Sequence, residues 1–132
     1  MSGETNLARL LATMQPELQA GEYVFCTAGP DAAVSGALGW FREAEGVSVI
    51  LPRTEADAQG FTYSYVAAWL TLTVQSSLEA VGLTAAVATA LAREGISCNV
   101  VAAYYHDHLF VASADAERAL RALHKLSSEA AR

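Results

Sequence analysis

The sequence predicts an α+β fold in which antiparallel sheets carry helices on one face. Residues 65–74 place valine, leucine or alanine at every second position, which is typical of a strand with one buried face. Residues 83–91 repeat leucine and valine every four residues, which is typical of a helix that packs on a sheet. The chain has 132 residues, 53% of them hydrophobic, so it can bury the core that such a fold needs.

The first predicted element is a helix near the N-terminus. Four apolar residues have the spacing of one helix face: Leu7, Leu10, Leu11 and Met14. Thr5 or Asn6 can accept hydrogen bonds from the amides of the first turn. Pro16 ends the helix, because the residue before a proline avoids helical geometry.

Strand patterns follow in the rest of the first half. Residues 23–27 are rich in aromatic and β-branched side chains and predict a strand, which the turn residues 29–31 close. Residues 38–43 and 47–51 flank a short turn and predict a hairpin. Residues 54–57 can start a short helix.

The second half has a clearer order of elements. After the predicted helix, Gly95 supplies a stop, and residues 96–105 and 109–112 predict two strands. A last helix begins at Asp115. With the strand at 65–74 this order is β-α-β-β-α, and one more strand from the N-terminal half would complete the β-α-β-β-α-β unit of the ferredoxin-like group.

A weaker series of similar order in the first half suggests a tandem of two ferredoxin-like units. We predict an N-terminal unit at residues 1–61 and a C-terminal unit at residues 62–132. Since a core of about 60 residues is marginal alone, we expect one body with two halves.

Charge and composition exclude several kinds of partner. The net charge is −6, and no basic cluster is longer than a pair, so we expect no nucleic-acid partner. There is neither a stretch of 18 uninterrupted apolar residues nor a signal-like N-terminus, so we expect no membrane contact and a cytoplasmic location. Cys26 and Cys98 lie in apolar runs and are expected to be buried thiols. The high apolar content favours a homodimer or a higher homo-oligomer.

Three motifs in the second half resemble the ACT-domain family: residues 76–84 (SSLEAVGLT), 95–101 (GISCNVV) and 104–108 (YYHDH). In the first half, residues 21–25 and 41–46 resemble the N-terminal unit of small stand-alone family members. Those members carry two tandem ACT-like units, similar to the regulatory regions of aspartate kinases. The likeness extends over nearly the full length of the chain.

The resemblance implies a ferredoxin-like fold for each unit and an amino acid bound at the interface of two paired units. It implies an allosteric sensor or regulator and no cofactor. Two positions depart from the family pattern, since Gln75 stands where a histidine is frequent and Ala103 where a glycine is frequent. If either position touches the ligand, we expect a different specificity.

The loop from Gln75 to Thr84 leads into the predicted helix at its N-terminus. Unpaired amides and the helix dipole favour an anion there, such as an α-carboxylate. Ser76 and Ser77 can add hydroxyl donors. A structural explanation stays open, in which a serine caps the helix and Gly82 relieves a tight turn.

Residues 104–108 gather two tyrosines, two histidines and an aspartate where the strand at 96–105 ends. Asp107 could bind an ammonium or guanidinium group, and a tyrosine could cover an apolar side chain. His106 and His108 would share one face of a strand, where a metal ion is an alternative ligand. A further alternative is a polar hairpin in which Asp107 bonds to its own turn.

The candidate ligand-binding residues are Gln75, Ser76, Ser77, Val81, Gly82, Leu83, Thr84, Asn99, Tyr104, Tyr105, His106, Asp107 and His108. Asn99 is included because asparagine is disfavoured within a strand, which suggests a specific partner for its amide. We assign no catalytic residue and no metal ligand. The sequence has no phosphate-binding glycine motif and no cysteine-pair spacing for zinc.

These observations favour a non-catalytic protein that binds a small molecule, with an amino acid as the expected ligand. The ligand would lie between the loop 75–84 and the turn 104–108. The alternative is a structural or interaction module without a small ligand, whose exposed sheet edges join it to itself or to another protein.

Overall fold

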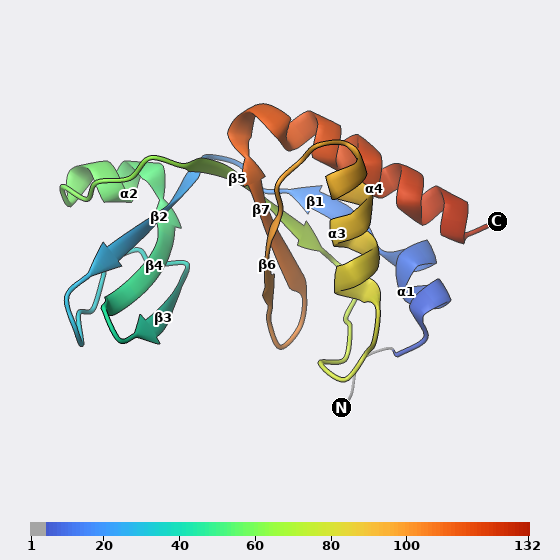
Figure 1. The fold of residues 1–132 in the computed structure, drawn as a ribbon, viewed down its shortest axis with the longest axis horizontal. Helices are drawn as coiled ribbons and strands as arrows, with labels where there is room; N and C mark the ends of the chain where they lie inside the picture. The colour runs from blue at the N-terminus through green and yellow to red at the C-terminus, as the bar shows by residue number, and fades with distance from the viewer. Residues whose placement is uncertain (1–4) are drawn as a thin grey trace. The chain divides into compact units, whose positions relative to one another are not determined.

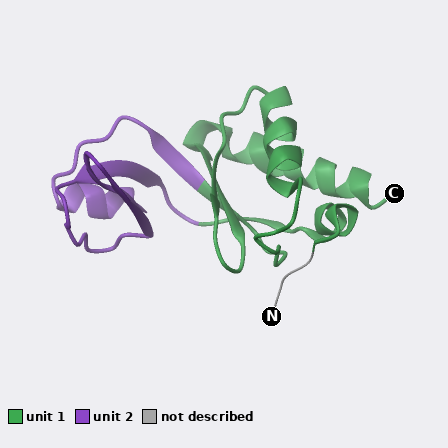
Figure 2. Cartoon of the chain, turned by 60° about the horizontal axis from the view of Figure 1, so that its bottom comes forward, with its two compact units in different colours: residues 1–19, 69–132 green, residues 20–68 purple. Residues whose placement is uncertain are grey.

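The structure is a computed structural model that describes residues 5–132 (Figure 1). The chain divides into two compact units (Figure 2). Unit 1 combines the described residues up to Gln19 with Trp69–Arg132, and unit 2 is Ala20–Ala68. Strand β5 (Val66–Leu72) runs across this division and contributes to both units. The boundary predicted between residues 61 and 62 divides the sequence differently and stays a prediction.

Helix α1 (Leu7–Thr13) confirms the first predicted helix. Asn6 is its N-cap, and the Asn6 Oδ1 atom accepts a hydrogen bond from the Arg9 amide at 3.0 Å. The helix ends at Thr13. Its C-cap Met14 has an extended backbone, two residues before Pro16, as the proline predicts.

A short strand, β1 (Pro16–Leu18), follows α1 and was not predicted as a strand. It pairs antiparallel with β5, with Pro16 opposite Leu72 and Leu18 opposite Leu70. Pro16 is tolerated because it is the first residue of an edge strand. This strand is the one that the sequence required from the N-terminal half to complete the second ferredoxin-like unit.

The sheet of unit 1 has the strand order β1-β5-β7-β6, with β6 (Asn99–Ala102) and β7 (Asp107–Ala112). Helix α3 (Leu83–Arg93) follows β5. After β7, the 3-10 turn η1 (Ser113–Asp115) leads into helix α4 (Ala116–Ala130). With β1 as the last strand, this arrangement confirms the predicted β-α-β-β-α-β unit.

The helices of unit 1 bury the faces that their sequences predict. Leu83, Val87 and Leu91 are the buried residues of α3, four positions apart. Ala119 and Leu123 are buried on α4. The pattern at residues 83–91 is therefore confirmed as the core-facing side of a helix.

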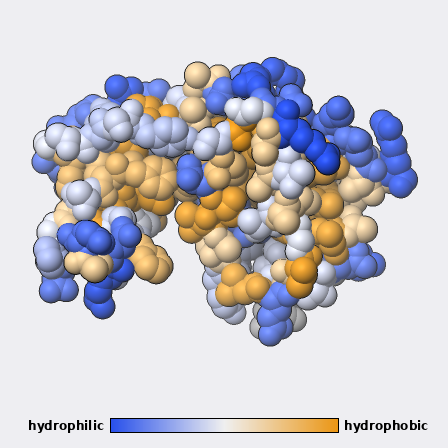
Figure 3. All heavy atoms as spheres, in the orientation of Figure 1, coloured by the Kyte–Doolittle hydropathy of each residue, from blue (hydrophilic) through white to orange (hydrophobic). Residues whose placement is uncertain are grey.

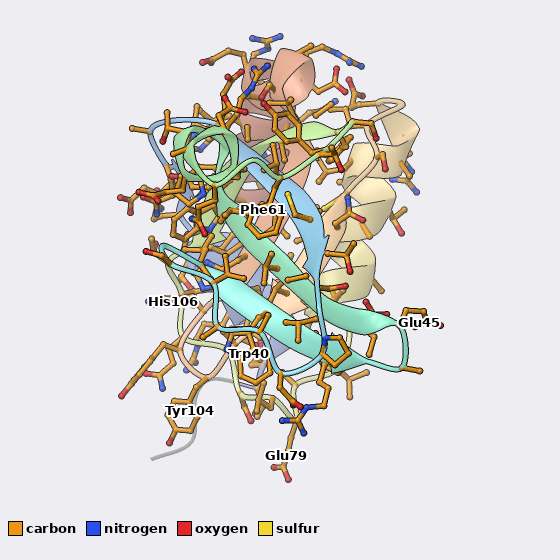
Figure 4. All side chains as sticks on the ribbon, turned by 90° about the vertical axis from the view of Figure 1, so that its left-hand side faces the viewer. Trp40, Glu45, Phe61, Glu79, Tyr104 and His106 are labelled. Atoms are coloured by element: carbon orange, nitrogen blue, oxygen red, sulfur yellow. The ribbon has the colours of Figure 1, made fainter. Side chains whose placement is uncertain are left out.

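Unit 2 has the strand order β3-β4-β2-β5, with β2 (Tyr23–Ala28), β3 (Gly39–Glu43) and β4 (Gly46–Pro52). The β3–β4 pair confirms the predicted hairpin, and α2 (Arg53–Ala58) confirms the short helix. The buried core of unit 2 consists of Val24, Cys26, Val47, Val49, Leu51 and Ala56. Phe61 packs against this core (Figure 4).

The predicted strand at 96–105 is wrong in its extent. β6 covers only Asn99–Ala102, and β7 begins at Asp107 instead of residue 109. The Ala103 amide donates to the His106 carbonyl at 3.1 Å and closes a loop between the two strands. Aromatic side chains favour strands, but Tyr104 and Tyr105 lie in this loop.

Within residues 5–132, no helix is long and apolar enough to cross a membrane. Both cysteines are free thiols, with Cys26 buried and Cys98 half-buried. Burial raises the pKa of the Cys98 thiol to about 11 and also raises the pKa of Cys26.

Candidate functional site

A cavity of about 110 Å³ lies in unit 1 at the start of α3. Its wall combines the loop before α3, the first residues of that helix, and the facing ends of β6 and β7. The lining residues are Ser76, Ser77, Leu78, Ala80, Gly82, Leu83, Thr84, Ala102 and Asp107.

Gly82 shapes the entrance of the chain into α3. It is the N-cap, and its φ of 101° is left-handed, which favours glycine. A Cβ atom at this position would lie 2.9 Å from the Leu7 Cδ2 atom of α1. The predicted tight turn is confirmed, and no side chain of the described residues caps the helix here.

The first amides of α3 are open donors. The first helical bond runs from the Ala86 amide to the Gly82 carbonyl at 2.9 Å. Among residues 5–132, the amides of Leu83, Thr84 and Ala85 have no acceptor. Leu83 and Thr84 line the cavity, so its wall carries unpaired donors and the positive end of the helix dipole.

The two serines stabilise the loop in front of the helix. The Ser77 hydroxyl oxygen accepts a hydrogen bond from the Glu79 amide at 3.1 Å, and the Ser77 carbonyl accepts one from the Ala80 amide at 3.0 Å. The Ser76 hydroxyl donates to the Ser77 carbonyl at 3.3 Å. Neither described serine caps α3, so the serine-cap part of the structural explanation is wrong, while its Gly82 turn is confirmed. The Ser77 hydroxyl proton is left for a ligand.

Among the described residues that line the cavity, Asp107 is the only titratable one, and it begins β7. It is 8% exposed, its carboxylate has no hydrogen bond or ion pair with any of residues 5–132, and its oxygens keep some contact with solvent. Burial raises the pKa of Asp107, while the charges of His108 and His106 act in the opposite direction. A largely buried carboxylate without a protein partner has lost part of its hydration, so this side chain favours a cationic ligand group.

The register of the β6–β7 hairpin explains which predicted residues meet at the cavity. Asp107 pairs with Ala102, and both line the cavity. Neighbouring residues of a strand point to opposite faces, so His108 lies on the other face of the sheet. Asn99 pairs with Phe110, two residues after His108, and shares that other face.

On that face, His108 is held by neighbours within the sheet. Its Nδ1 atom accepts a hydrogen bond from the Trp69 Nε1 atom at 3.0 Å and lies 3.1 Å from the Thr71 hydroxyl. Burial lowers the pKa of His108, and because an indole only donates, the Nδ1 atom carries no proton. The Asn99 amide contacts the Phe110 carbonyl at 3.5 Å.

The remaining predicted residues lie outside the cavity wall. Tyr104 and Tyr105 are exposed and contact each other edge to face, with ring centroids 5.0 Å apart, and Tyr104 points away from the ribbon (Figure 4). Val81 is 83% exposed. Gln75 is half-buried, and the His106 Nδ1 atom lies 3.5 Å from the Val74 carbonyl.

The metal alternative finds no ligand set in residues 5–132, where no three His, Cys, Asp or Glu side chains are grouped to hold an ion. The cavity also includes three residues that the sequence did not single out: Leu78, Ala80 and Ala102. Their side chains have no polar or charged group that would mark them as ligand-binding residues in the sequence. Ala102 could have been found only from the hairpin register that places it opposite Asp107.

Two ACT-domain models match the chain, one over residues 2–68 and the other over residues 64–125. The chain belongs to the ACT-domain family. The two matches follow one another along the sequence, so this is a small ACT-domain protein with two ACT units, as the motifs at residues 76–84 and 95–101 predicted.

Solved structures extend this result. A protein of unknown function from Vibrio cholerae, described as a possible transport protein, is 48% identical, covers 92% of this chain and 95% of its own, and superposes with a TM-score of 0.81. An Agrobacterium tumefaciens protein is 21% identical, with coverages of 86% and 89% and a TM-score of 0.66. The ligand-free regulatory subunit of aspartate kinase from Thermus thermophilus is 13% identical, with coverages of 88% and 98% and a TM-score of 0.60.

At 21% and 13% identity, the last two structures show a common fold alone. No curated protein matches the sequence of this ACT-domain protein.

Proposed function

We propose that this ACT-domain protein is a non-catalytic regulatory protein that binds the head group of an amino acid in the cavity at the start of α3. One observation carries the proposal. A buried, unpartnered carboxylate at Asp107 and unpaired amide donors at Leu83 and Thr84 line the same cavity. A zwitterion supplies both missing partners, since its ammonium suits the carboxylate and its carboxylate suits the amides.

The size of the cavity limits which part of the ligand it holds. Its volume of about 110 Å³ is well below the roughly 300–1,000 Å³ of sites for drug-sized ligands. The α-carbon with its ammonium and carboxylate fits this space, and the ligand side chain extends beyond it. Ser77 would add a hydroxyl donor to the carboxylate.

The chemistry of the wall favours binding over catalysis. A nucleophile needs a base within hydrogen-bonding reach, and the lining residues that the structure describes contain no histidine, lysine or cysteine. His108 lies on the other face of the sheet, with its Nδ1 atom engaged by Trp69. Membership of the ACT family supports a regulatory role, and the residues named here favour a head-group site in unit 1.

The test is thermal unfolding of the full chain in the presence of each of the twenty amino acids at millimolar concentration. A ligand at about 100 times its dissociation constant stabilises the native state by about 2.7 kcal/mol, which raises the Tm by several degrees. The Asp107→Asn variant keeps the size of the side chain and removes its charge. We expect one or a few amino acids to raise the Tm of the native chain and not of this variant.

Glu79→Gln is the matched control, because Glu79 is an exposed carboxylate of the same loop outside the cavity wall. It should respond to the ligand as the native chain does. The proposal would be refuted if none of the twenty amino acids raised the Tm of the native chain, or if they raised the Tm of Asp107→Asn equally.

One observation favours a second function, self-association through a sheet edge. β3 is the last strand of the sheet order in unit 2, and its Trp40 and Phe41 are 63% and 74% exposed. Unpaired edges with apolar side chains are natural pairing sites. Sedimentation velocity should show a dimer that Phe41→Glu dissociates and Val81→Glu does not. A native chain that is monomeric at high concentration would exclude this function.

A further inference from the structure

A second hollow, of about 350 Å³, lies between α3 and α4 in unit 1. Four cationic side chains line it: Arg93 from α3, and Arg118, Arg121 and Lys125 from α4. They are half of the eight lysines and arginines of a chain whose net charge is −6. The gathering of so many cations in one groove of an acidic protein requires an explanation.

One of the four cationic side chains is bonded to other residues of the protein. The Arg118 guanidinium donates to the Asp115 carboxylate at 3.0 Å and to the Glu94 carbonyl, which joins the start of α4 to the end of α3. Arg93, Arg121 and Lys125 have no side-chain hydrogen bond or ion pair with any of residues 5–132. Three cations of the groove are therefore open to a ligand.

Without a bound anion, the three open cations of the groove repel one another. Arg121 and Lys125 are four residues apart on α4, so they are neighbours on one helix face and repel each other. Arg93 adds a third positive charge from the other wall of the same groove. Small residues, Ala90 and Ala122, also line the groove and leave it space for an anion.

We propose that the groove between α3 and α4 binds a compact, multiply charged anion, such as a phosphate ester or a polycarboxylate, as a second ligand of this protein. Guanidinium groups bind phosphate and carboxylate oxygens with paired hydrogen bonds, and a lysine adds a point charge. The volume of the groove lies within the roughly 300–1,000 Å³ of small-molecule sites. Within residues 5–132, no residue lines both this groove and the cavity at the start of α3.

The charges around the groove select a compact anion over an extended one. Glu94 and Glu129 also line it; Glu129 is four residues beyond Lys125, about 6 Å along the helix, and eight residues beyond Arg121. An extended polyanion such as a nucleic acid would meet these carboxylates and the negative charge of the whole chain. The exposed surface over α4 is mostly hydrophilic, so an apolar partner is not favoured on it (Figure 3).

Isothermal titration of the full chain at low salt tests the proposal, with inorganic pyrophosphate and citrate as probes and acetate as the singly charged control. We expect pyrophosphate or citrate to bind, acetate to fail, and the affinity to fall as sodium chloride is added. Which of the two binds more tightly separates a phosphate ligand from a polycarboxylate ligand. In the Arg121→Gln/Lys125→Gln variant the affinity should drop by about tenfold or more.

Glutamine forms helices as well as arginine and lysine do, so the double variant should keep α4, which far-ultraviolet circular dichroism checks. Arg42→Gln, which removes an exposed cation of unit 2, is the matched control and should bind as the native chain does. Equal affinity in the native chain and the double variant would overturn the proposal. So would the absence of binding by both multivalent probes, or binding of an oligonucleotide in preference to them.

Discussion

Unit 1 and unit 2 order their strands in the same way, but they differ between their first and second strands. In unit 1, α3 connects β5 to β6, whereas in unit 2 the loop at residues 29–38 connects β2 to β3. The cavity that we assign to an amino acid is built on the first turn of α3. The same strand order therefore does not by itself provide the site.

The hollow that unit 2 has beside its connecting loop is of another kind. It measures about 330 Å³, and its lining residues are Ala32, Ala33, Val34, Ala37, Trp40 and Val49. These side chains are apolar and offer no charge to an ammonium or a carboxylate. The two units share a strand order, but only the cavity of unit 1 is polar. Its polarity comes from the open amides at the start of α3 and from the carboxylate of Asp107.

The largest difference that we expect between the units concerns this connection. Leu91 of α3 is fully buried, and Leu91→Ala should lower the free energy of unfolding by about 2–5 kcal/mol. Val34 of the unit 2 loop is half-buried, so Val34→Ala should cost about 1 kcal/mol or less. Urea unfolding of both variants measures the two losses.

Val81→Ala is the control, because that exposed side chain should change the free energy of unfolding by less than about 0.5 kcal/mol. Equal losses for Leu91→Ala and Val34→Ala would mean that the loop stabilises unit 2 as strongly as α3 stabilises unit 1.

A second difference lies at two glycines. Gly46 in the β3–β4 turn has a φ of 149°, and a Cβ atom there would lie 2.4 Å from the Ala28 carbonyl oxygen, which is backbone and cannot move aside. Gly46→Ala should therefore cost about 3 kcal/mol. At Gly82 in unit 1 the nearest atom is the end of the Leu7 side chain, which can rotate, so Gly82→Ala should cost about 1–2 kcal/mol.

Gly39→Ala is the matched control for Gly46, since it lies in the same hairpin and no atom comes within 4 Å of its added Cβ. Thermal unfolding should rank the three variants Gly46→Ala, Gly82→Ala and Gly39→Ala from least to most stable. A Gly82→Ala variant less stable than Gly46→Ala would show that Leu7 is as rigid as backbone.

The elements that the sequence predicted well are those in which a hydrophobic pattern repeats many times. The alternation through β5 and the four-residue repeat of α3 each extend over several turns or pairs, so one face could be identified. β1 was missed because three residues that begin with a proline show no period. Its pairing with β5 depends on contacts between residues more than 50 positions apart.

In the candidate site, the prediction depended on where the strand before Asp107 ends. The loop before α3 and Asp107 meet as predicted, because β7 places Asp107 and Ala102 opposite each other on the face toward that loop. The sequence extended the preceding strand too far and so could not separate Asp107 from His108. Alternation sends these neighbours to opposite faces. The pairing of Ala102 with Asp107, next to the hydrogen bond from the Ala103 amide to the His106 carbonyl, fixes where the alternation starts.

The smallest effect that we predict is the pH dependence of the free energy of unfolding that Asp107 and His108 cause. The two residues lie on opposite faces of the sheet, and their effects have opposite signs. Burial raises the pKa of Asp107 above its ordinary value of 3.8, so the native state holds this proton more tightly than the unfolded chain does. The free energy of unfolding therefore falls as pH rises through the range just above 3.8. Burial lowers the pKa of His108 below 6.5, so its contribution is lost as pH falls through the range below 6.5.

Asp107→Asn separates the two contributions. At pH 7 the variant should be more stable than the ligand-free native chain, because it no longer buries a charge, and the advantage should disappear in acid, where Asp107 is protonated. Urea unfolding at several pH values measures this difference. A variant that is less stable than the native chain at pH 7 would mean that the Asp107 carboxylate already has a partner, in which case the cavity in unit 1 would not need the ammonium of an amino acid.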